Sequence, residues 1–146
     1  MTAQELWNLY AAQNNVDRYK YDAWAFGDQP DLLAQLVATG EKTATASAYP
    51  LYEVENDPLP VAGEYNVILD TNNNAICITK TTKVTIVPFY TVTAEHAFKE
   101  GEGDKSLCYW RQVHERLFTQ WMAEAGLEFT PQMNVVCEEF EVVCMP

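Results

Sequence analysis

Hydrophobic and polar residues follow two different periodicities along this chain, one typical of helices and one typical of strands. Near the start, "TAQELWNLYAAQ" places Leu6, Leu9 and Tyr10 on one side of a helix. Thr2 and Glu5 have the spacing of a capping box, in which each side chain bonds the backbone of the other. The pattern predicts an N-terminal helix over about residues 2–14.

A second helical pattern lies in "DQPDLLAQLVATG". We expect Asp28 to cap this helix and Pro30 and Asp31 to occupy its first turn. Gly40 stands where a glycine commonly follows the last helical residue. The predicted buried stripe consists of Leu32, Leu33, Leu36 and Val37.

A third helix is predicted in the C-terminal half, where either Asp104 or Ser106 can be its N-cap and Gly126 ends it. Large apolar residues recur there at helical spacing, with either Val113 or His114 between them: Leu107, Trp110, Leu117, Phe118 and Trp121. This stripe is typical of a helix that packs on a core.

Between residues 43 and 92 the pattern changes to that of strands. "EYNVILD", "TNNN" and "AICITKTTKVTIVPF" predict strand, turn and strand, and "VENDPLPVAGE" before them predicts a loop. "NVVCEEFEVV" predicts a final strand. The order of elements favours an α+β domain with a mainly antiparallel sheet and helices at its ends.

The length of 146 residues predicts one domain over residues 1–146, and a hydrophobic content of 48% suffices for a packed core. No apolar run reaches the length of a membrane span. Without a secretion signal, a cytoplasmic protein that does not bind membranes is expected. The four cysteines, Cys77, Cys108, Cys137 and Cys144, lack paired spacing. We therefore expect buried free thiols and neither a disulfide, a metal nor a cofactor.

The net charge of −12 comes from 21 acidic and 9 basic side chains. Such a field opposes binding of duplex DNA and weakens binding of long RNA, since both depend on neutralising phosphates. A small nucleoside or nucleotide ligand stays compatible with it. The local basic patch that we expect consists of Lys42, Lys80, Lys99, Lys105 and Arg111.

The segment "GEKTATASAY" holds one lysine among small and hydroxyl residues, which leaves room for a ligand. In an ideal strand Lys42 and Thr45 point to opposite faces, because side chains alternate. They converge only if Lys42 precedes the strand or a bulge intervenes. The ordinary alternative is a solvent-exposed lysine.

Acidic residues gather in "TAEHAFKEGEGDKS", before the third helix. Acidic groups are favourable at a helix start, so charge alone does not single out Glu100. His96 and His114 fit ordinary helix or surface positions better than a metal site.

Several motifs in this order resemble the ASCH domain family of the PUA-like superfamily over about residues 22–143: "AWAFGD", "GEKTATAS", "PLPVAGEYNVILD", "TKVTIVPF", "AEHAFKEGEGDKSLCYWRQVHERLF" and "CEEFEVV". The resemblance implies a PUA-like fold, a small mixed or antiparallel β-barrel with flanking helices. Some short members of the family are amidohydrolases that remove the acyl group of N4-acetylcytidine.

The family's site pattern falls on Gly40, Lys42, Thr43 and Thr45, with its glutamate at Glu100. The resemblance thus implies Lys42, Thr45 and Glu100 as catalytic residues of a nucleoside amidohydrolase. Members often carry an arginine where this chain has Ser47, which leaves the substrate open. The alternatives are an RNA or modified-nucleotide binding module without turnover, and a ribonuclease.

We expect the ligand to contact residues beside the motif, aromatic side chains that stack on a base, and cations of the basic patch. These are Thr43, Ser47, Trp24, Tyr49, Lys80 and Arg111. Two mechanisms remain open. Either a neutral Lys42 takes the proton of Thr45, or a charged Lys42 stabilises the oxyanion and Glu100 is the base. We favour the first, because small neighbours indicate a partly buried amine.

Overall fold

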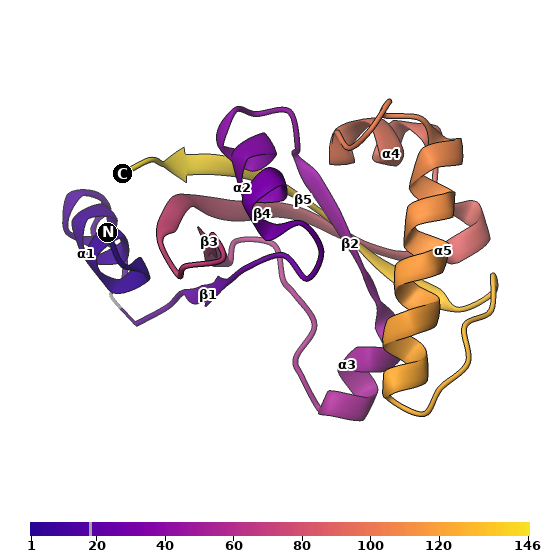
Figure 1. The fold of residues 1–146 in the computed structure, drawn as a ribbon. Helices are drawn as coiled ribbons and strands as arrows, with labels where there is room; N and C mark the ends of the chain where they lie inside the picture. Colours follow the sequence, from indigo (N-terminus) through magenta and orange to yellow (C-terminus); the bar gives the residue numbers. More distant parts are fainter. Residues whose placement is uncertain (18) are drawn as a thin grey trace.

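A curled five-stranded sheet organises the computed structural model, which describes residues 1–17 and 19–146 (Figure 1). The strand order is β1-β3-β4-β5-β2. β1 (Asp22–Trp24) runs parallel to β3 (Tyr65–Leu69), and the other neighbours are antiparallel. The remaining strands are β2 (Ala44–Ala48), β4 (Ala75–Pro88) and β5 (Asn134–Cys144).

β4 and β5 are long and link the two ends of the molecule. Their pairing shifts register between Ile78 and Thr79 and again between Thr81 and Lys83. Irregularities of this kind bend strands and increase their twist, which curls the sheet. Figure 1 shows α1 beyond one end of these strands and α5 beyond the other.

The helices cover different parts of the sheet. α1 (Ala3–Asn14) and α2 (Pro30–Ala38) contact β3 and β4, and α3 (Tyr49–Glu55) contacts β5. α4 (Ala94–Glu100) contacts β2 and α5 (Leu107–Glu124). A 3-10 turn, η1 (Phe89–Thr91), joins the end of β4 to the segment before α4.

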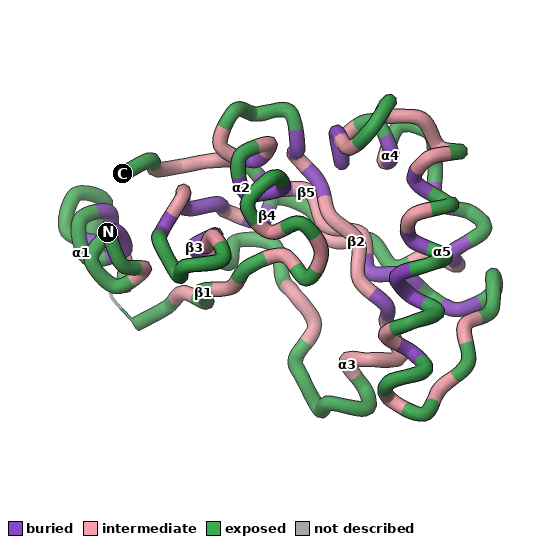
Figure 2. The backbone as a smooth tube through the Cα atoms, in the orientation of Figure 1, coloured by how far each residue is buried: buried purple, intermediate pink, exposed green. Residues whose placement is uncertain are grey.

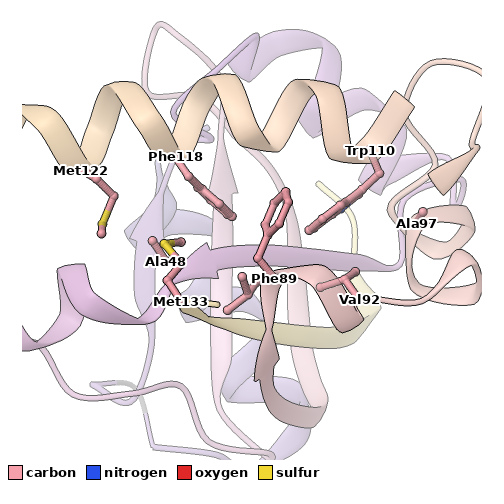
Figure 3. Close-up of a cluster of buried hydrophobic side chains, with 9 residues drawn as sticks. Ala48, Phe89, Val92, Ala97, Trp110, Phe118, Met122 and Met133 are labelled. Atoms are coloured by element: carbon pink, nitrogen blue, oxygen red, sulfur yellow. The ribbon is translucent and has the colours of Figure 1, made fainter. Parts of the chain in front are cut away.

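α5 packs on its own aromatic core. Phe89 lies between Trp110 and Phe118 in this cluster, with ring centroids at 5.3 and 6.2 Å (Figure 3). Buried and exposed residues alternate along the helix (Figure 2), as its amphipathic sequence requires. This core fixes Trp110, which also reaches the site described below.

Most of the predicted elements are confirmed, including the α+β class with a barrel-like sheet and flanking helices. Thr2 and Glu5 form the capping box of α1, and Ser106 is the N-cap of α5. Gly40 and Gly126 follow α2 and α5 with φ values of 82° and 76°. The hairpin of β3 and β4 and the final strand β5 also agree with the sequence pattern.

Three details of the helix predictions are wrong. Asp28 does not cap α2, because Gln29, in a left-handed conformation, occupies the cap position before Pro30. Leu32 is exposed, because α2 buries Leu33, Ala34 and Val37 instead. Leu9 is exposed, because α1 turns Trp7 to the core beside Leu6 and Tyr10.

The prediction of strands from residue 43 to 92 is wrong for residues 49–55, which form α3 with a proline at its second position. The sequence pattern also missed two short elements, β1 and α4. All four cysteines are free thiols, but only Cys77 is buried and Cys108 is exposed. Among the described residues, no helix is both long and apolar enough to cross a membrane.

Candidate functional site

Lys42 lies in the turn between α2 and β2, shortly before the strand begins at Ala44. Its backbone N–H donates to Leu36 O at 3.0 Å, and the N–H of Thr43 donates to Lys99 O at 2.7 Å. These bonds fix the turn between α2 and α4. Because Lys42 precedes the strand, its side chain escapes the alternation that would direct it away from Thr45. The lysine is only 1% exposed.

Glu100 is the last residue of α4 and is as deeply buried as Lys42. Gly101 follows it with a φ of 71°, in the left-handed region that glycine adopts readily. A Cβ atom at Gly101 would collide with the carbonyl oxygen of Glu41 and approach the Cα of Lys42. The glycine therefore allows the end of α4 to lie against the turn that carries Lys42.

The ammonium of Lys42 bridges two carboxylates. Its Nζ lies 3.2 Å from Glu100 Oε1 and 2.8 Å from Glu102 Oε2. His114 of α5 also contacts Glu100, with its Nε2 at 3.5 Å from Glu100 Oε1. Segments that are far apart in the sequence thus meet in one buried ionic network.

The second oxygen of Glu100 is also engaged. Trp110 Nε1 donates to Glu100 Oε2 at 2.5 Å, and His96 Nε2 lies 2.7 Å from the same oxygen. His114 stacks on Trp110 at 4.2 Å between ring centroids, and its Nδ1 lies 2.8 Å from Trp110 O. Lys42, His96, Trp110 and His114 thus surround the Glu100 carboxylate.

Burial alone would raise the pKa of Glu100, but the positive charge of Lys42 and the nearby His114 hold it well below its usual range. Burial would likewise lower the pKa of His114, yet the Glu100 carboxylate outweighs it and the net pKa is raised. An ionised carboxylate with partners on both oxygens holds other groups in place better than it exchanges protons.

A cavity of about 600 Å³ opens beside this network. Lys42, Thr45 and Glu100 all line it, and Trp24 and Phe26 form an aromatic wall. Lys42 Nζ lies 5.4 Å from the centroid of the Phe26 ring. Ligand pockets of roughly 300–1,000 Å³ accept molecules of nucleoside size, so the cavity is large enough for one.

The cavity lining is strongly acidic. Within the described part of the chain, its lysine is Lys42, and its acidic residues are Asp22, Asp28, Asp57, Glu64, Glu100, Glu102 and Glu138. Lys42 bonds two of these carboxylates but offsets only one negative charge, so the lining keeps an excess of negative charge. A phosphate is disfavoured in such a cavity, whereas a neutral or cationic ligand is not.

The structure brings together five of the nine residues predicted for the site. Trp24 and Ser47 line the cavity together with Lys42, Thr45 and Glu100, the three residues predicted to be catalytic. Trp24 Nε1 donates to Asn66 Oδ1 at 2.9 Å, and Ser47 Oγ lies 2.8 Å from Tyr52 Oη. These bonds fix polar atoms of the wall.

The other four predicted residues are not part of the cavity lining. Thr43 Oγ1 donates to Lys99 O at 3.3 Å, and Tyr49 begins α3. Lys80 Nζ lies over the Tyr65 ring at 5.6 Å, and Arg111 Nη2 donates to Tyr90 O at 3.1 Å. Of the expected basic patch, only Lys42 faces the cavity.

Several residues of the site were not selected from the sequence, among them Glu102, Trp110, His114 and Glu138. Trp110 and His114 lie on the buried stripe of α5. Core residues and site residues recur there at the same helical spacing, so the pattern does not distinguish them. Glu138 carried a weak signal, since it is a charged residue in the apolar pattern of the last strand.

Glu100, Glu102 and His114 have ligand atoms within 4.8 Å of one another, a spacing compatible with a metal ion. Lys42, however, bonds both of these carboxylates. The lysine therefore already supplies positive charge where a metal would supply it.

Comparison with known proteins relates the chain to one family and to several solved structures. The family described as the ASCH domain matches residues 22–144. An ASCH domain structure from Lactobacillus crispatus JV V101 is 31% identical, with a TM-score of 0.85 over 96% of this chain and 95% of that chain. Protein EF3133 from Enterococcus faecalis V583 is 38% identical, with a TM-score of 0.90 over 97% and 88%.

A more distant structure, a mutant of ZmASCH from Zymomonas mobilis, is 13% identical and has a TM-score of 0.51. The match covers 83% of this chain and 67% of that chain, and at this identity it shows a shared fold alone. None of the curated proteins matches this chain.

Proposed function

Because this chain belongs to the ASCH domain family, we propose that it hydrolyses the bond between an acyl group and the amino nitrogen of a pyrimidine nucleoside, as in N4-acetylcytidine. The observation that carries the proposal is the cavity beside the buried network, where Lys42, Thr45 and Glu100 lie together. A hydroxyl that lines the same cavity as a fixed positive charge is suited to acyl transfer.

Each of the three residues has a distinct role in this proposal. The Thr45 hydroxyl attacks the acyl carbon, and the Lys42 ammonium stabilises the negative charge that develops on the carbonyl oxygen. Glu100 holds Lys42 in place, since partners surround both of its oxygens. This geometry favours Lys42 as a fixed charge over Lys42 as a base.

The cavity wall supports an unphosphorylated nucleoside as the ligand. Trp24 and Phe26 offer apolar surface for a base, with ring centroids 4.9 Å apart and planes at 82°. The acidic residues of the lining disfavour the phosphates of a nucleotide or of RNA. The same charges make a ribonuclease the weakest of the alternatives.

The direct test is release of acetate and cytidine from N4-acetylcytidine by the purified chain. Thr45→Ser should keep measurable activity because the hydroxyl remains, and Thr45→Ala should lose it. Circular dichroism of each variant controls for folding. If the parent leaves N4-acetylcytidine and related acylated pyrimidine nucleosides intact, the proposal is wrong.

The second candidate is a module that binds a modified nucleoside without turnover. The aromatic wall of Trp24 and Phe26 favours it, because stacking needs no catalytic group. Calorimetric titration with cytidine and N4-acetylcytidine distinguishes the two functions. Saturable binding without hydrolysis would favour the binding module.

A further inference from the structure

We propose that Glu138, rather than Glu100 or Lys42, is the base that takes the proton of the Thr45 hydroxyl when the Thr45 oxygen attacks the acyl carbon. This inference rests on the proposed hydrolysis, and it assigns the proton transfer to a residue outside the family motif. Three features of Glu138 support it: its position in the sheet, its free carboxylate and its surroundings.

Glu138 is the direct cross-strand neighbour of Thr45. In the antiparallel pairing of β2 and β5, Thr45 lies opposite Glu138. Residues opposite each other in such a pair point to the same face, with Cβ atoms about 4.5–5.5 Å apart. Both side chains line the cavity. The carboxylate of Glu138 is therefore within reach of the Thr45 hydroxyl or of one intervening water.

The carboxylate of Glu138 has no hydrogen-bond or ion-pair partner among the residues that the structure describes. Among residues 1–17 and 19–146, no side chain or backbone N–H donates a hydrogen bond to it and no cation pairs with it. Glu100 differs in this respect, because Lys42, His96, Trp110 and His114 surround its two oxygens. Of the two glutamates, Glu138 is the one with lone pairs free for a proton from Thr45.

The surroundings of Glu138 suit a group that gains and loses a proton near neutrality. Burial, with a smaller repulsion from Glu64, raises the pKa of Glu138 to about 7. Tyr52 of α3 lines the same cavity, and its pKa is raised by burial and, to a smaller extent, by the Glu138 charge. The other titratable groups of the cavity are Lys42 and His114 with Asp22, Asp28, Asp57, Glu100 and Glu102.

Glu138 accepts and returns one proton in each half of the proposed reaction. The proton of the Thr45 hydroxyl moves to the Glu138 carboxylate while the Thr45 oxygen bonds to the acyl carbon. The bond from that carbon to the amino nitrogen breaks, and the proton passes from Glu138 to the departing nitrogen. Water then attacks the acyl-threonine ester, gives one proton to Glu138, and the Thr45 oxygen leaves and takes that proton back. The products are the free amine and a carboxylic acid.

The pH dependence of hydrolysis provides the test. The ionised form of Glu138 is the active one, so kcat/KM of the parent should rise with pH and level off above about 7. Glu138→Gln should lower kcat by about 100-fold, because an amide does not accept the proton. Glu139→Gln is the matched control: its side chain alternates to the other face, where it pairs with Lys99.

A second variant makes the test independent of the folding of Glu138→Gln. Glu64→Gln removes the negative charge that repels the Glu138 carboxylate, so it should lower the pKa of Glu138 and shift the rise of kcat/KM to lower pH. If the parent is active but Glu138→Gln retains its kcat, or Glu64→Gln leaves the limb in place, Glu138 is not the base while the proposed function stands. A parent without hydrolytic activity overturns both.

Discussion

Lys42 and Glu100 are separated by 58 positions in the sequence, yet Lys42 Nζ lies 3.2 Å from Glu100 Oε1 and each side chain is only 1% exposed. Burial of either charge alone would cost roughly several kcal/mol, because removal of one partner leaves the other charge buried and uncompensated. The pair therefore matters for stability as well as for the site.

Glu100→Gln should lower the free energy of unfolding by about 3–5 kcal/mol, because Lys42 and His114 lose the charge between them. Urea denaturation measures the effect. Glu95→Gln is the control, since Glu95 makes an ion pair with Lys99 that is exposed to water and contributes little to stability. Equal losses in the two variants would show that the buried network is not structurally important.

Lys42→Arg should keep part of the hydrolytic activity, because the positive charge that stabilises the oxyanion remains. Lys42→Ala should lower kcat by at least about 100-fold. Lys83→Ala, which removes an exposed lysine, is the control and should behave as the parent. A folded Lys42→Arg protein as inactive as Lys42→Ala would support Lys42 as a base instead.

Glu138→Gln should stabilise the protein at alkaline pH. In the folded state the pKa of Glu138 is about 7, above the ordinary value of 4.5. The folded state therefore loses stability as the pH rises from 4.5 to about 7. We expect the free energy of unfolding of Glu138→Gln to exceed that of the parent by roughly 2 kcal/mol at about pH 8 and to match it at about pH 4.

Thermal unfolding across this pH range measures the difference. Glu139→Gln should behave in the opposite way at alkaline pH, because its bond to Lys99 lowers the pKa of Glu139 and stabilises the ionised form. If the parent and Glu138→Gln show the same dependence of stability on pH, the pKa of Glu138 is the same in the folded and unfolded states.

Gly101→Ala should destabilise the chain by about 3 kcal/mol and impair hydrolysis, because the added Cβ collides with the turn before Lys42. Gly126→Ala is the matched control. It has a similar φ of 76° but no atom near its Cβ, so only about 1 kcal/mol of backbone strain is expected. Chemical denaturation and turnover of the two variants separate the collision from the strain.

Long RNA should bind weakly, with an affinity that falls steeply as salt is added. Of the described lysines only Lys42 faces the cavity, and the acidic residues of its lining repel phosphates. Fluorescence anisotropy with a labelled RNA at several salt concentrations measures this. Sub-micromolar affinity that resists salt would contradict the assignment to a nucleoside and favour an RNA-binding function.

The sequence predicted the long elements because their patterns are local. The capping box of α1 and the N-cap Ser106 depend on residues three positions apart, and the β3–β4 hairpin on its polar turn. The short helices were missed for the same reason. α3 follows β2 directly, and its seven residues make only about two turns, which is too short for a helical period to be recognised.

The site was predictable only where the family motifs mark it. Lys42 and Thr45 lie in one motif and Glu100 in a second, but the convergence of Glu102, His114 and Glu138 depends on strand order and helix packing. The neighbour of Thr45 across the sheet is Glu138 and not Glu139 because of the register of β5. A shift of one residue would exchange their faces, and no local pattern fixes that register.

The sheet order also determines when the site can form during synthesis. Within the described residues β2 pairs with β5 alone, and β5 is made about ninety residues after it. A nascent chain that ends before residue 134 carries Lys42 and Glu100 but has no strand to hold Thr45. The pocket is therefore completed late, when β5, the strand that carries Glu138, pairs with β2.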